Sequence, residues 1–114
     1  MSFIQQGVIG SSSSSGASLV SIVGNSTIGS GSQTVTTAGT RVQLSVASVP
    51  CKKVIIQGGV DNGGWIYVGD STVASSNGYA IAASQSVIIT PSNLNLIYID
   101  SSVNGEGVKY LYEN

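Results

Sequence analysis

Short runs of alternating apolar and polar residues, separated by turn signals, limit most strongly what this chain can fold into. In residues 41–46 the alternation places Val42, Leu44 and Val46 on one face of a strand. Comparable runs follow at 53–57, 65–68, 87–90, 96–100 and 107–112. Gly, Pro or Asn-Gly ends most of them, and no segment shows a sustained helical period. The pattern therefore predicts an all-β protein.

The spacing of these runs predicts one domain in residues 33–114. We expect a single β-sandwich or jelly-roll-like domain of seven to eight short antiparallel strands, preceded by an extended N-terminal arm, residues 1–32. A chain of 114 residues has no room for a second sizeable core. The expected core residues are Val42, Leu44, Val46, Val54, Ile56, Ile66, Val68, Val87, Ile89, Ile97, Ile99, Val108 and Tyr110.

The arm combines Ser/Gly tracts such as residues 11–16 with short apolar clusters. Fixing such a backbone costs roughly 1–2 kcal/mol per residue, which a contact must offset. One interpretation is that the apolar residues bind another protein chain, and the other is that they add a strand to their own domain. An artificial tag or linker is a third. The partner-binding candidates are Phe3, Ile4, Val8, Ile9, Leu19, Val20, Ile22 and Val23.

Charge is scarce in this sequence. Charged residues make up 8% of the chain and the net charge is -1. Four basic residues are too few to follow a phosphate backbone, which argues against nucleic-acid binding. Little self-repulsion favours association between subunits. The first residues lack the pattern of a secretory signal, and no apolar run approaches the ~20 residues of a membrane span. We therefore expect cytoplasmic synthesis and no membrane partner.

The residues that usually carry out catalysis are few. The chain has no histidine and a single cysteine, Cys51, which removes Ser-His and Cys-His dyads and thiolate zinc sites. We expect no enzymatic activity, no cofactor and no metal site, and interpret Cys51 as a small buried hydrophobe. A paired-carboxylate glycosidase and a single calcium ion at the turn 61–64 remain minor alternatives. The carboxylates are Asp61, Asp70, Asp100, Glu106 and Glu113.

Trp65 and Tyr67 alternate with Ile66 and Val68. If Ile66 and Val68 face the core, the two aromatic side chains face outward. Outward aromatic residues suit a subunit interface or a glycan site. The alternative is a reversed strand with Tyr67 inside.

Residues 34–112 resemble the small β domain of capsid decoration (cement) proteins of tailed bacteriophages. The segments that carry the resemblance are 34–40, 44–45, 50–54, 66–69, 77–79 and 105–112. The resemblance implies a virion structural protein on the outer capsid surface, made in the host bacterial cytoplasm. It also implies a homo-oligomer, with a trimer favoured, that binds and stabilises the major capsid protein shell. It brings no catalytic residues. Similar modules occur in tails and fibres, so the alternative function is carbohydrate or receptor binding.

Overall fold

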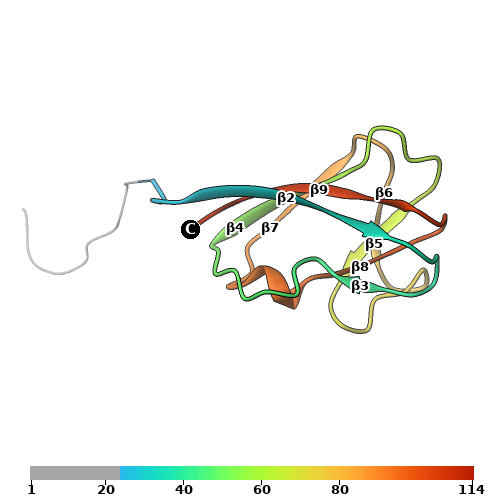
Figure 1. The fold of residues 1–114 in the computed structure, drawn as a ribbon, viewed down its shortest axis with the longest axis horizontal. Helices are drawn as coiled ribbons and strands as arrows, with labels where there is room; N and C mark the ends of the chain where they lie inside the picture. The colour runs from blue at the N-terminus through green and yellow to red at the C-terminus, as the bar shows by residue number, and fades with distance from the viewer. Residues whose placement is uncertain (1–23) are drawn as a thin grey trace, which may run out of the picture.

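Two antiparallel four-stranded sheets make up residues 24–114, the part of the chain that the computed structural model describes (Figure 1). The first sheet contains, in spatial order, β2 (Ile28–Val35), β9 (Glu106–Glu113), β4 (Lys53–Gly58) and β7 (Ser86–Ile89). The second contains β3 (Val42–Gln43), β8 (Tyr98–Ser101), β5 (Ile66–Gly69) and β6 (Tyr79–Ile81). A short 3₁₀ turn, η1 (Leu94–Leu96), precedes β8, and no α-helix occurs within residues 24–114. The all-β prediction is confirmed.

The inner faces of both sheets contribute to one apolar cluster, which gives the domain a sandwich-like arrangement. Val54 and Ile56 of the first sheet and Ile66 and Ile99 of the second are fully buried in it. Each such side chain stabilises the fold by about 1.5–3 kcal/mol when it is removed from water. Eight of the expected core residues are buried in this cluster, and four more pack against it half-buried.

Val46 is the exception among the expected core residues, because its side chain is 82% exposed. The alternation in residues 41–46 predicts one continuous strand, but β3 ends at Gln43. Its partner strand explains the early end. Leu44 donates its N–H to the carbonyl of Ile97. The residues just before Ile97 form η1 and not an extended strand, so no strand lies beside the chain toward Val46 and the ladder ends.

Strand β2 crosses the boundary expected between residues 32 and 33. Residues 28–32, which the sequence analysis placed in the arm, pair with β9 in a continuous register from Ile28↔Glu113 to Val35↔Glu106. Just before the strand, Thr27 and Asn114 exchange backbone hydrogen bonds of 2.9 Å in both directions. The two ends of the described chain therefore lie side by side, as Figure 1 shows.

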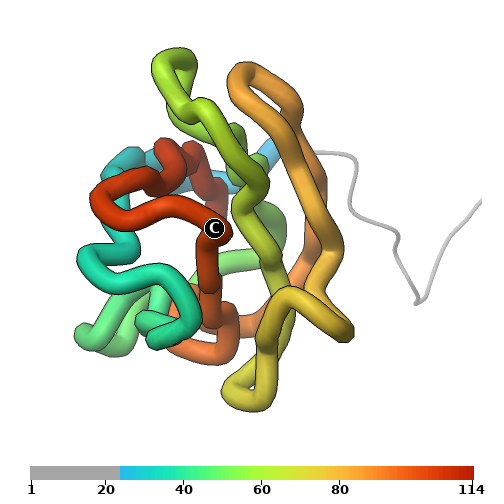
Figure 2. Tube along the Cα trace, turned by 90° about the vertical axis from the view of Figure 1, so that its right-hand side faces the viewer, coloured from blue at the N-terminus to red at the C-terminus, as the bar shows by residue number. Residues whose placement is uncertain are grey.

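At the end of the domain opposite to the paired termini, the turn that follows β2 contacts the turn that precedes β9. Figure 2 looks onto this end, where the turn after β2 lies beside the turn that precedes β9. Ala38 donates its N–H to the Oδ1 of Asn104, and Gly105 donates its N–H to the carbonyl of Val35. Gly39 and Gly105 have φ values of +86° and +81°, a conformation that favours glycine. These turns fix the register of β2 on β9.

Candidate functional site

An apolar row crosses the outer face of the first sheet. Because side chains alternate along a strand, Ile55, Ile88 and Leu111 point away from the core that Val54 and Ile56 occupy. The register places Ile55 opposite Leu111 on one side and opposite Ile88 on the other. Leu111 is 48% exposed and Ile88 57% exposed. We call these three residues the outer apolar row.

Charged and polar side chains border the outer apolar row on both sides. Lys53 and Glu113 occupy the next outward positions on one side, and their charged groups lie 3.7 Å apart. Both side chains are well exposed, so this ion pair contributes at most about 1 kcal/mol. Lys109 and Gln57 are register partners on the other side of the row. An apolar centre with a polar border is the general composition of a protein–protein interface.

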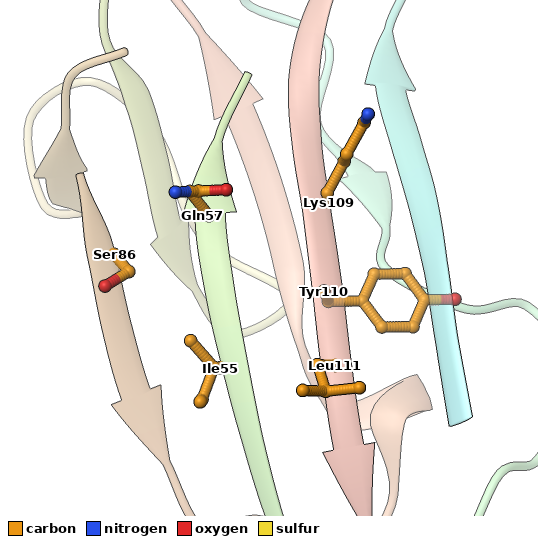
Figure 3. A pocket seen from close by; sticks show the side chains of 6 residues that line it. All are labelled: Ile55, Gln57, Ser86, Lys109, Tyr110 and Leu111. Carbon is orange, nitrogen blue, oxygen red and sulfur yellow. The ribbon is translucent and has the colours of Figure 1, made fainter. Parts of the chain in front are cut away.

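The surface beside the row is hollowed. A shallow depression of about 280 Å³ is lined by Ile55, Leu111, Gln57 and Lys109, together with Ser86 and Tyr110 (Figure 3). Figure 3 shows the Tyr110 ring directed away from this depression toward β2. The depression is open and shallow, so it suits a protruding side chain of a protein partner better than an enclosed small molecule.

Trp65 and Tyr67 lie on the outer face of the second sheet, as their alternation with buried Ile66 and Val68 predicts. Trp65 is 49% exposed, whereas Tyr67 is half-buried. The structure therefore keeps the two aromatic residues on one face but separates that face from the outer apolar row, which belongs to the other sheet.

Four of the carboxylates have structural partners in the described residues. Glu106 accepts hydrogen bonds from the N–H groups of Gly63 at 2.6 Å and Gly64 at 3.0 Å. Asp100 is buried and accepts the N–H of Gly39 at 2.9 Å and that of Ser101 at 2.8 Å.

The other two of these carboxylates lie nearer the surface. The Glu113 carboxylate accepts a bond from Asn25 and faces Lys53. Thr72 donates its hydroxyl and its N–H to Asp70, which lowers the pKa of that carboxyl, with a smaller contribution from the charge of Arg41. All four carboxylates thus organise turns or strand ends.

Within residues 24–114 the structure contains no group of three or more His, Cys, Asp or Glu side chains that could hold a metal ion. Cys51 is 4% exposed, and burial raises the pKa of its thiol. The thiol of Cys51 donates a hydrogen bond to the carbonyl of Pro91, with 3.3 Å between sulfur and oxygen. No helix in this part of the chain is long and apolar enough to cross a membrane.

The expected partner-binding residues of the arm, from Phe3 to Val23, lie outside the described residues. In their place the structure presents the outer apolar row, which the sequence analysis did not single out. A signal for it existed in the sequence. Runs such as 54–56 and 87–89 are continuously apolar, so a strand with one face on the core must turn at least one apolar side chain outward.

No family model, curated protein or solved structure matches this chain.

Proposed function

We propose that this chain is a virion structural protein, a capsid decoration protein of a tailed phage with a jelly-roll-like domain and an N-terminal arm. In this proposal it binds and stabilises the shell of the major capsid protein on its outer surface. The resemblance of residues 34–112 to decoration proteins suggests a phage capsid as the binding partner. In this proposal the outer apolar row is the surface that contacts the capsid.

The outer apolar row is the observation that carries the proposal. Leu111, on the inner strand β9, and Ile88, on the edge strand β7, keep about half of their surface in water on the same face of a regular sheet. Covering an exposed aliphatic side chain of this size contributes about 1 kcal/mol. One such contact is weak, but many copies on a repeating shell bind a connected lattice of sites. An open apolar row with a polar border suits this shared, low-affinity docking.

Co-sedimentation with empty shells of the same phage tests the proposal. We expect the wild-type chain to pellet with the shells and Leu111→Ser to lose about fivefold in affinity, because serine removes the apolar contact at one exposed end of the row. Val46→Ser is the matched control, since Val46 is equally aliphatic and 82% exposed but lies outside this face. Equal binding by Leu111→Ser and wild type would refute the docking surface.

A second experiment concerns the arm. We expect a chain that lacks residues 1–23 to keep its circular dichroism spectrum, because residues 28–113 supply both described sheets and the buried cluster between them. In the proposed mechanism the apolar residues of the arm add contacts to neighbouring capsid subunits, so the truncated chain decorates shells more weakly. Undiminished decoration by the truncated chain would remove the arm from the mechanism.

The aromatic face favours a second candidate, a carbohydrate- or receptor-binding module of a tail or fibre. Trp65, which directly precedes β5, is half exposed, and Tyr67 lies on the same outer face of the second sheet. Aromatic faces of this kind stack on sugar rings. Binding on a glycan array that disappears in Trp65→Ala but persists in Leu111→Ser would favour this candidate over shell decoration.

A further inference from the structure

Strand β2 forms a long edge of the first sheet that no other strand of residues 24–114 covers. It stands at one end of the order β2-β9-β4-β7, and its eight residues, Ile-Gly-Ser-Gly-Ser-Gln-Thr-Val, contain no charge and no proline. The other edge strands in the described chain are shorter, with four residues in β7, two in β3 and three in β6. Edges are usually guarded by charge, proline, bulges or brevity, because exposed backbone groups pair with other chains.

The backbone groups along this edge follow from the pairing of β2 with β9. In an antiparallel ladder, residues that exchange two hydrogen bonds alternate with residues whose N–H and C=O point away. Thr27 and Asn114 exchange both bonds, so in the continuous register Gly29 and Gly31 also face β9. The backbone groups of Ile28, Ser30, Ser32 and Thr34 therefore point to the free edge.

One of these groups already has a local partner. The N–H of Thr34 donates to the Oε1 of Gln33, while the Nε2 of Gln33 donates to the carbonyl of Gln43. In the hydrogen bonds of residues 24–114, neither Ser30 nor Ser32 has a partner on the edge side. These two serines are the centre of the unpaired edge.

We propose that a second copy of this chain binds here, with β2 of one copy antiparallel to β2 of the other about a two-fold axis at Gly31. The positions of the edge groups are symmetric about Gly31, so Ser30 meets Ser32 of the other copy and Ile28 meets Thr34. About six backbone hydrogen bonds then join the copies. The first sheet of one copy and the first sheet of the other become one continuous eight-stranded sheet.

The side chains of β2 permit this approach. Ser30 and Ser32 are small and uncharged, and Gly31 places no side chain at the axis, so the register brings no like charges together. A net charge of -1 per chain adds little repulsion. The pairing is self-complementary and closes at two copies. It therefore predicts a dimer, in contrast to the trimer that the resemblance implies, and it does not depend on the proposed function.

Sedimentation equilibrium of the full chain tests the proposal with Ser30→Pro and Ser30→Ala. Proline removes an edge N–H that β9 does not use and blocks the partner's approach, so we expect dimer affinity to fall at least tenfold while the fold is kept. Alanine keeps the N–H and should dimerise like wild type. A wild-type chain that stays monomeric, a trimer, or an unaltered dimer in Ser30→Pro would each overturn the proposal.

Oxidative cross-linking checks the register without proline. Ser30→Cys combined with Ser32→Cys places each new thiol opposite its counterpart, so the double variant should form a covalent dimer. Either single variant should not, because the same residue in the two copies lies beyond the reach of a disulfide. Equal cross-linking in single and double variants would contradict this register.

Hydrogen exchange tests which segment pairs with the free edge of β2, a second copy of the chain or the chain's own residues 1–23. In the dimer the amides of Ser30 and Ser32 exchange slowly at high protein concentration and fast at low concentration. The amides of Gly29 and Gly31, which bond β9, stay slow at both. Slow exchange of Ser30 and Ser32 in a monomer at every concentration would show that the edge is covered from within, and would refute the dimer.

Discussion

The aromatic ring of Tyr110 lies directly over Gly31 on the neighbouring strand. A Cβ atom built on Gly31 would come within 2.5 Å of the Tyr110 hydroxyl oxygen and 2.6 Å of the ring carbon that carries it. Tyr112 covers Gly29 in the same way, and the two ring centroids are 6.4 Å apart. Burial, with a contribution from Tyr112, raises the pKa of Tyr110. The tyrosine rings of β9 thus fill the space beside the glycines of β2, which have no side chains of their own to pack there.

Gly31→Ala should destabilise the domain. In open space the change to alanine stabilises a protein by about 0.4–1 kcal/mol, because it restricts the unfolded chain. Here the methyl group displaces the Tyr110 ring, so we expect a net loss of about 1–3 kcal/mol in urea unfolding. Gly24→Ala is the control, because nothing lies within 4 Å of its Cβ position. A Gly31→Ala variant as stable as Gly24→Ala would show that the ring yields freely.

Glu106→Ala should loosen the turn before β5. The carboxylate of Glu106 binds two successive N–H groups, those of Gly63 and Gly64, and charge-assisted bonds of this kind are strong. We expect a loss of about 1–3 kcal/mol in the free energy of unfolding, with Glu106→Gln intermediate because one amide oxygen remains an acceptor. Equal stability of the alanine variant and wild type in thermal unfolding would contradict this role.

Thr72→Val should raise the pKa of Asp70. The Thr72 hydroxyl, at 2.6 Å, is the main cause that holds this pKa below its ordinary value. Because the folded pKa is lowered, the interaction stabilises the fold above the unfolded pKa of about 3.9 and is lost as the pH falls through the folded value. Carboxyl-carbon NMR titration measures the shift. Thr72→Ser keeps the hydroxyl and should keep the low pKa; a similarly raised pKa in both variants would refute this cause.

Cys51 should be unreactive in the folded protein. It is 4% exposed, and burial raises the pKa of its thiol, so little thiolate exists near neutral pH. We expect a thiol-specific chromogenic disulfide to label it slowly without denaturant and within the mixing time in urea. Fast labelling under native conditions would show that the region around Pro91 opens readily.

Periodicity predicted the regular part of the core. Leu44, Ile66 and Ile99 are buried where the alternation of apolar residues places them. Val73 and Leu94 are also buried, but they lie in a turn and in η1, where no period of two applies. Val73 packs beside Gly69 and Gly78, a contact between positions that sequence spacing does not relate.

For β2 the sequence left two interpretations of the arm open, one of them an added strand on its own domain, and it predicted neither the bounds nor the partner of that strand. Its glycines and serines have low β propensity, and the pairing depends on the tyrosines of β9, more than seventy residues later in the chain. The outward direction of Trp65 was predicted, since it follows from alternation alone. The outer apolar row was not, because it arises from the register of three strands, which the sequence does not specify.

Cryo-electron microscopy of empty shells incubated with the chain tests the central claim most directly. The account predicts density at regular positions on the outer shell, with the outer apolar row of Ile55, Ile88 and Leu111 against capsid subunits. Shells without added density, or density in which the face of Trp65 contacts the shell and the outer apolar row faces solvent, would contradict it.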